Sequence, residues 1–219
     1  SMLNITKNTG HIPNIFSKDD IEHIKKFLLK MSKTIGYGTG GDDYIKAADH
    51  YGADHTSIIY PWIQKIIKPK LYKYFGDFNL VFISFNNSYV PFDIHSDEYW
   101  HKNLNLSGKP LFTFLIPCSV DDIETNCNLA STVVFDECGG QGAGRIPPEL
   151  INKEENALQY HDSFLSHCLP EDLKKVNVKQ RHIWNYGALV WFDSNLLHTS
   201  GCFDGFKTKQ CLVGHTYVE

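Results

Sequence analysis

Three side chains of the kinds that bind metal ions are spaced so that they could form one site. His95 and Asp97 are separated by Ser96, and His198 follows an apolar run much later in the chain. Residues two apart on a strand project to the same face, so His95 and Asp97 could both reach one ion while Ser96 points away. With His198 they would offer two imidazoles and one carboxylate to one face of a divalent ion and leave its other positions open for chemistry. The competing interpretation is that so short a motif arises by chance and that these are ordinary polar residues at strand ends.

The segments that must position these residues are short and apolar. After Gly76 the apolar spacing changes from helical to strand-like, and Gly, Pro, Asn and Asp separate the runs. Several short strands behind a helical region predict an α+β chain whose core is a double-stranded β-helix, the jelly roll of the cupin type. The predicted strands are Leu80 to Phe85, Pro91 to Asp97, Leu111 to Ile116, Thr132 to Phe135, His182 to Trp184, Ala188 to Phe192 and Lys209 to Tyr217.

Two helices are predicted ahead of this core. Ser17 is a good N-cap, and Asp19 and Asp20 place acidic side chains in the first turn. Apolar residues then recur at helical spacing over 21–31 and again over 58–71. We expect both apolar stripes to pack on one sheet, so that residues 1–79 form a mainly helical support for a jelly-roll core over residues 80–219.

Two glycine-rich segments are predicted to be loops. Residues 36–44 are rich in glycine and tyrosine, and residues 139–145 open a loop-rich insertion over residues 138–180. The second run lacks the strand-to-helix context of a phosphate-binding loop. Loops carry much of the selectivity of enzymes, so the first could touch the substrate, although a plain flexible connection is an open alternative, and the second is expected to be a flexible insertion whose shape could also affect selectivity.

Length and charge limit the class of protein. A chain of 219 residues fits one well-buried domain, 1–219. Its 21 basic and 25 acidic residues give a net charge of −4, and without a basic stripe this disfavours a nucleic acid partner. No apolar stretch approaches the roughly 20 residues that span a bilayer, and the start lacks a signal-peptide core. We therefore expect a soluble, cytoplasmic protein without a membrane partner.

The cysteines give little sign of disulfide bonds. The chain has 6 of them and no Cys-x-x-Cys pair, and a domain of this size does not need disulfide bonds to fold. We therefore expect free thiols. Cys202 and Cys211 lie nearest to His198 in sequence and are rival ligands, because a thiolate would suit zinc.

Taken together, these segments give the chain a recognisable resemblance. It resembles the Fe(II)- and 2-oxoglutarate-dependent dioxygenases, especially the phytanoyl-CoA-hydroxylase-like and prolyl-4-hydroxylase-like branch. Three segments carry the resemblance, which covers the chain from about residue 80 onward: the triplet 95–97, the run 131–135, and the run 187–193 that leads to His198. The resemblance implies that His95, Asp97 and His198 bind Fe(II), that 2-oxoglutarate chelates the metal, and that O2 is the oxidant.

The resemblance also implies a cation for the distal carboxylate of 2-oxoglutarate. In the family this is an Arg or Lys beyond the second histidine, and here Lys207 and Lys209 are placed to serve, sharing one face of a predicted strand. Lys209 is preferred because an apolar strand follows it. A lysine offers a point charge in place of a bidentate fork, so a hydroxyl from Thr113 or Tyr89 could help to fix the carboxylate.

Two further residues near the motif have open roles. Asp93 shares strand parity with His95 and Asp97, and it could orient His95 or face the substrate. His215 corresponds to an aromatic position in some relatives.

The function implied by the resemblance is hydroxylation of an unactivated C–H bond in a small molecule or a peptide side chain, with release of succinate and CO2. Two alternatives stay open: a metal-binding cupin with other chemistry, such as an isomerase, and a jelly-roll binding module without catalysis. The prime substrate and the oligomeric state do not follow from the sequence.

Overall fold

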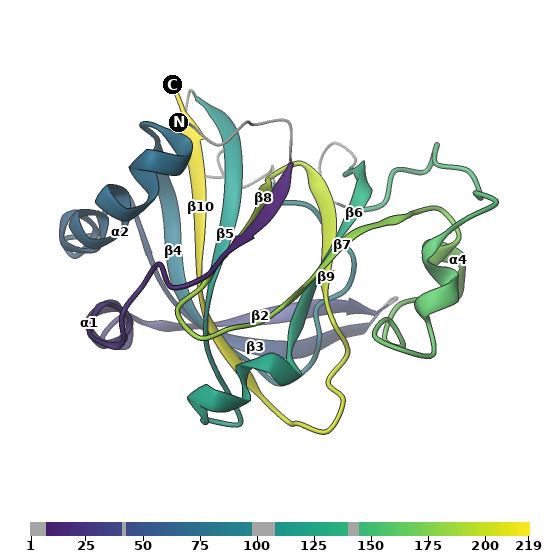
Figure 1. Ribbon diagram of the computed structural model, residues 1–219, viewed down its shortest axis with the longest axis horizontal. Coiled ribbons are helices and arrows are strands. Elements are labelled where there is room, and N and C mark those ends of the chain that lie inside the picture. The colour runs from purple at the N-terminus through teal and green to yellow at the C-terminus, as the bar shows by residue number, and fades with distance from the viewer. Residues whose placement is uncertain (1–7, 41–42, 98–107, 140–144) are drawn as a thin grey trace.

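Two antiparallel sheets make up most of the computed structural model, which describes residues 8–40, 43–97, 108–139 and 145–219 (Figure 1). The larger sheet has seven strands in the order β1-β8-β5-β10-β4-β3-β2. The smaller has three strands in the order β7-β6-β9. The strands of the larger sheet are β1 (Thr9–Ile12), β2 (Lys33–Gly40), β3 (Asp43–Asp54), β4 (Asn79–Ser88), β5 (Lys109–Val120), β8 (Leu189–Asp193) and β10 (Lys209–Val218). Those of the smaller sheet are β6 (Ser131–Cys138), β7 (Val178–Ile183) and β9 (Leu196–Ser200).

The helix α1 (Lys18–Leu28) begins where the sequence predicts it. The Ser17 hydroxyl accepts from the backbone N–H of Asp20, and the Asp20 carboxylate accepts from the backbone N–H of Ser17. This reciprocal capping box satisfies two N–H groups that the first turn would otherwise leave without partners. The second predicted helix is α2 (Tyr60–Phe75).

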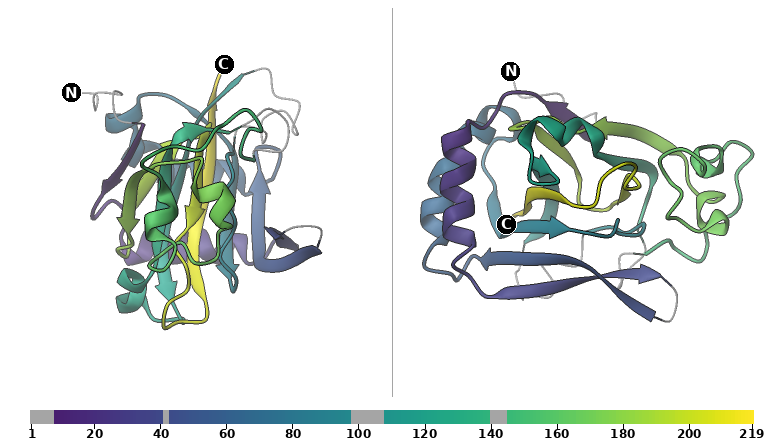
Figure 2. Two further views of the ribbon diagram at one scale, coloured as in Figure 1. Left: turned by 90° about the vertical axis from the view of Figure 1, so that its right-hand side faces the viewer. Right: turned by 90° about the horizontal axis from the view of Figure 1, so that it is seen from below.

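Both helices lie side by side at one end of the molecule, and the insertion between β6 and β7 lies at the other (Figure 2). One hydrophobic cluster joins the buried faces of the helices to the larger sheet. Its members include Ile24 of α1, Ile67 of α2, and Phe85 and Phe114 of the sheet, all nearly without exposed surface. Within the part of the chain that the structure describes, no helix is long and apolar enough to cross a membrane.

The prediction for residues 36–44 is wrong. The described residues there belong to β2 and β3, which pair in antiparallel register from Lys33 opposite Tyr51 to Gly40 opposite Asp43. Gly36, Gly38 and Gly40 lie within β2, and β3 pairs with β4, so both strands belong to the larger sheet. The first part of the chain therefore contributes three strands as well as its two helices.

The prediction of a strand over Pro91 to Asp97 is also wrong. This segment has no strand ladder and makes a single isolated bridge, between His95 and His198. Strand β9, which carries His198, and the short strand β1 were not predicted. The insertion holds one 3-10 turn, Ala157–Tyr160, and the one-turn helix α4 (Pro170–Leu173), and its residues 140–144 lie outside the described residues.

Candidate metal centre

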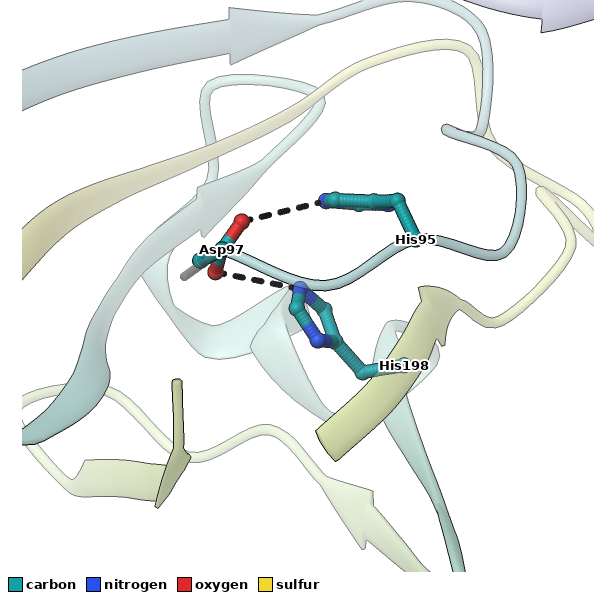
Figure 3. Close-up of side chains that lie close together, drawn as sticks. All are labelled: His95, Asp97 and His198. Atoms are coloured by element: carbon teal, nitrogen blue, oxygen red, sulfur yellow. Dashed lines mark ion pairs between the residues drawn. The ribbon is translucent and has the colours of Figure 1, made fainter. Parts of the chain in front are cut away.

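The three predicted metal ligands converge at one point. His95 Nε2 lies 3.5 Å from one carboxylate oxygen of Asp97, and His198 Nε2 lies 3.2 Å from the other (Figure 3). The donor atoms of all three residues lie within 4.8 Å of one another. Two imidazoles and a carboxylate at this spacing form the facial set that non-haem Fe(II) sites use.

Backbone hydrogen bonds hold the three residues together, although 95–97 is not a strand. The N–H of His95 donates to the carbonyl of His198 at 3.0 Å, and the N–H of His198 donates back at 2.8 Å. The N–H of Asp97 donates to the carbonyl of Ser194 at 2.8 Å. The loop is therefore bonded to β9 at His95 and to the turn before β9 at Asp97, so both ligands are held by the segment that carries the third.

The two histidine rings are oriented through the nitrogen that faces away from the site. His95 Nδ1 lies 2.7 Å from the carbonyl oxygen of Asp93, and His198 Nδ1 lies 3.0 Å from that of Leu196. A carbonyl only accepts, so each Nδ1 carries the proton and each Nε2 keeps its lone pair for a metal. Asp93 thus orients His95 through its backbone carbonyl, while its own carboxylate accepts from the N–H of Ile94.

Asp97 is an ionised carboxylate in a buried position. Its side chain is 6% exposed, and Thr113 donates its hydroxyl to Oδ2 at 3.0 Å. Burial alone would raise the pKa of Asp97, but the imidazoles of His198, His215 and His95 hold the pKa well below its ordinary value. A negatively charged oxygen donor is therefore present beside the two imidazoles, and the residues fit a divalent metal ion.

A cavity of about 240 Å³ extends from this cluster between the two sheets, and Lys209 lines it. The Lys209 side chain is buried, and its ammonium donates to Ser200 Oγ at 2.6 Å. It lies 4.4 Å from the centre of the Trp184 ring, a favourable position for a cation. Burial lowers the pKa of Lys209 to about 8. In the described part of the chain no carboxylate pairs with this ammonium, so its charge is available to an anion that enters the cavity.

Lys207, Thr113 and Tyr89 do not lie where the anion site was predicted. Lys207 is exposed, and its backbone N–H donates to Asp121 in a turn. Thr113 lines the cavity beside Asp97 and pairs in register with His215, six residues along β10 from Lys209. Tyr89 is not among the residues that line the cavity.

The hydroxyl beside Lys209 belongs to Ser200, which sequence reasoning missed. Ser200 stands two residues after His198 and therefore projects to the same face of β9. The spacing of two residues between His198 and Ser200 can be read from the sequence, but β9 was not predicted as a strand. Trp184 and Cys211, also in the lining, complete the surroundings of the lysine. Burial raises the pKa of the Cys211 thiol to about 12, and among the described residues neither Cys211 nor Cys202 belongs to the cluster of potential metal ligands.

Comparison by sequence finds no match: no family model matches this chain, and no curated protein matches it. Comparison by structure finds oxygenase folds. An oxidoreductase of the 2OG-Fe(II) oxygenase family from Burkholderia pseudomallei matches with a TM-score of 0.57 at 12% identity, over 96% of this chain and 85% of that one.

Two further solved structures match at similar levels. The epimerase SnoN, in complex with Fe3+, alpha ketoglutarate and nogalamycin RO, has a TM-score of 0.58 at 10% identity over 96% of this chain and 78% of that one. HygX from Streptomyces hygroscopicus, with nickel, 2-oxoglutarate and hygromycin B bound, has a TM-score of 0.54 at 10% identity over 97% and 83%. The chain therefore has the jelly-roll-like fold of the 2-oxoglutarate- and Fe(II)-dependent oxygenases.

Proposed function

We propose that this protein is an Fe(II)- and 2-oxoglutarate-dependent oxygenase that hydroxylates an unactivated C–H bond of a small molecule or a peptide side chain. The observation that carries the proposal is the presence of two features in one cavity. One is the His95-Asp97-His198 cluster, and the other is the buried ammonium of Lys209 without a carboxylate partner among the described residues. A metal with open positions and a separate anion site are what a chelating dicarboxylate needs.

The residues of this chain would have two separate roles, one set holding the metal and the other holding the co-substrate. His95, Asp97 and His198 would hold Fe(II), which when bound supplies the activation of O2. Lys209 would receive the distal carboxylate of 2-oxoglutarate through a charge-assisted hydrogen bond, while Ser200, which accepts from Lys209 and donates to the carbonyl of Gly201, would orient the ammonium. The balanced reaction converts substrate, 2-oxoglutarate and O2 to hydroxylated substrate, succinate and CO2. No side chain of the protein is required to act as an acid or a base.

The walls of the cavity would exclude water from this chemistry. Phe192 packs against the His198 ring with centroids 4.1 Å apart, and Phe92 lies beside His95 at 6.2 Å. Leu115 and Val213 also line the cavity. Apolar walls around a reactive centre limit unproductive side reactions.

The test is an anaerobic titration of the Fe(II)-loaded protein with 2-oxoglutarate, followed by visible absorption. A charge-transfer band is expected for the wild type and should be lost in His95→Ala and Asp97→Ala. Lys209→Met should need far more 2-oxoglutarate to produce the same band. Uncoupled formation of succinate in air would then show that the bound co-substrate turns over.

The other outcomes distinguish the alternatives. Metal binding without a band at any concentration of 2-oxoglutarate would support a cupin with different chemistry. Absence of metal binding would support a jelly-roll binding module. Among proteins of this fold, SnoN is described as an epimerase, so analysis of the product of a substrate that couples to succinate formation tests hydroxylation itself.

A further inference from the structure

A break in the register of β10 lies beside the metal cluster. Both neighbours of β10 shift there: the pairing with β4 slips between His215 and Thr216, and the pairing with β5 slips between His215 and Tyr217. The Thr216 hydroxyl accepts from the N–H of Phe112 at 3.0 Å and donates to its carbonyl at 2.7 Å, which satisfies the backbone that the irregularity leaves unpaired. Bulges of this kind re-aim a side chain and are common next to active sites.

The side chain at this irregularity is His215, and it is linked to the metal cluster by its contact with Thr113. His215 is opposite Thr113 in the register of β5 and β10, and His215 Nδ1 lies 3.4 Å from Thr113 Oγ1. The same Oγ1 lies 3.0 Å from Asp97 Oδ2, whereas His215 Nδ1 is 4.0 Å from that oxygen. Thr113 is 1% exposed and His215 is 7% exposed, so water does not compete freely for these groups.

The direction of the hydrogen bonds follows from the chemistry of the groups. Thr113 gives its single hydroxyl proton to Asp97 Oδ2. The Thr113 oxygen then faces His215 as an acceptor, and the ring can donate to it through Nδ1. The three residues form a chain in which His215 fixes Thr113 and Thr113 fixes the carboxylate.

We propose that Thr113 and His215 are positioning residues for the metal centre, which set the rotation of the Asp97 carboxylate before a metal binds. A carboxylate side chain rotates easily about its last bond, and the Thr113 hydroxyl donates to Asp97 Oδ2 without using a histidine nitrogen that the metal needs. Thr113 therefore helps to fix the rotation of Asp97 in the metal-free protein. This inference rests on the proposed function only in taking Asp97 as a metal ligand.

The experiment measures metal affinity without turnover. Mn(II) and Co(II) binding is measured by calorimetry under anaerobic conditions, without 2-oxoglutarate, for the wild type, Thr113→Val, Thr113→Ser and His215→Phe. Loss of a hydrogen bond to a ligating carboxylate typically lowers metal affinity roughly 10- to 100-fold. We expect a loss of this size for Thr113→Val, a smaller loss for His215→Phe, and affinity close to wild type for Thr113→Ser, which keeps the hydroxyl.

Two controls separate positioning from a general loss of structure. Ser88→Ala removes another buried hydroxyl that lines the cavity, on β4, and should leave metal affinity unchanged. The double variant Thr113→Val/His215→Phe should bind metal no more weakly than Thr113→Val alone, because His215 acts through Thr113. Thermal unfolding of each metal-free protein identifies any variant that has lost its fold, and His215→Asn and Thr113→Ala replace such a variant.

The possible results are distinct. Wild-type affinity in Thr113→Val overturns the proposal, and fully additive losses in the double variant overturn the chain from His215 through Thr113. A shift of the visible Co(II) spectrum in Thr113→Val, restored in Thr113→Ser, supports a changed carboxylate. If the wild type itself binds neither metal, the failure lies with the proposed function.

Discussion

The ammonium of Lys209 and the hydroxyl of Ser200 meet across the two sheets, at 2.6 Å. Lys209 begins β10 in the larger sheet, and Ser200 ends β9 in the smaller one. Their contact places a buried cation at the strand that also carries His198. Any carboxylate held by Lys209 is thereby kept at a fixed position relative to the metal ligands.

Removing the Lys209 charge should weaken 2-oxoglutarate binding. A hydrogen bond to a charged group contributes about 1.5–3 kcal/mol, so Lys209→Met should raise the dissociation constant of the metal-loaded protein roughly 10- to 100-fold. Ser200→Ala removes a neutral partner and should cost about tenfold or less. Lys207→Met is the matched control, because Lys207 is exposed and outside the cavity, and it should bind like the wild type. Equal affinity for Lys209→Met and Lys207→Met would contradict the assignment.

The affinity for 2-oxoglutarate should also depend on pH. Burial lowers the pKa of Lys209 to about 8, and only the protonated form attracts a carboxylate. A bound anion favours the charged form and raises this pKa, so affinity is fully present below about pH 7 and is lost as the pH rises through about 8. Titrations between pH 6.5 and 9.5 measure this loss. In Lys209→Arg the cation stays protonated, and the loss above pH 8 should disappear.

Acid should destabilise the contact between the edges of the two sheets. His182 of β7 is 5% exposed, and its Nε2 lies 2.8 Å from the hydroxyl of Thr9 in β1. Burial, assisted by the neighbouring His11, lowers the pKa of His182 to about 4. Between pH 6.5 and 4 the unfolded chain therefore binds more protons than the folded one, so the free energy of unfolding falls as the pH falls.

The contribution of His182 to this loss should reach roughly 3 kcal/mol below pH 4. Urea unfolding of the metal-free protein at pH 7, 6, 5 and 4 measures the slope. His182→Gln keeps a polar group near Thr9 and has no proton to gain, so its slope should be smaller. A slope identical to that of the wild type would show that His182 is not a source of the acid sensitivity.

Gly214 should tolerate no side chain. It lies opposite Phe114 in the register of β10 and β5, and a methyl group at Gly214 would overlap the Phe114 ring. Phe114 is fully buried, so the ring has little room to move. Gly214→Ala should lower the free energy of unfolding by about 1–3 kcal/mol. The double variant Gly214→Ala/Phe114→Leu should lose less than the sum of the two single changes, and simple additivity would argue against an overlap.

Local sequence signals predicted much of the framework. The cap at Ser17 located α1, and apolar runs located β4, β5, β6, β8 and β10. Strands β2 and β3 were missed because glycines normally weaken strands, yet here β2 pairs with β3 along its length and β3 pairs with β4. Strand β9 was missed because five residues that follow a turn carry too short a pattern to recognise.

The three candidate metal ligands lie together as the sequence predicts, but they are brought together in a different way. Strand parity was meant to bring His95 and Asp97 together, whereas the structure brings them together in a loop bonded to β9 and to Ser194. The position of Thr113 beside Asp97 was not predicted, because it depends on which residue of β10 lies opposite it. Register between distant strands is a property of the assembled sheet, and a single sequence does not encode it in any local pattern.

Strand β10 is the last strand in the sequence, yet it lies between β5 and β4 in the middle of the larger sheet. During synthesis, β4 and β5 are therefore made before β10. Until β10 forms, each has an edge whose backbone N–H and C=O groups lack their partners. Closing the sheet requires β10 to insert between two strands made much earlier, a non-local step of the kind that slows folding. The newly made protein should be most prone to aggregation just before this insertion, and a chain cut short before residue 209 should stay in that state.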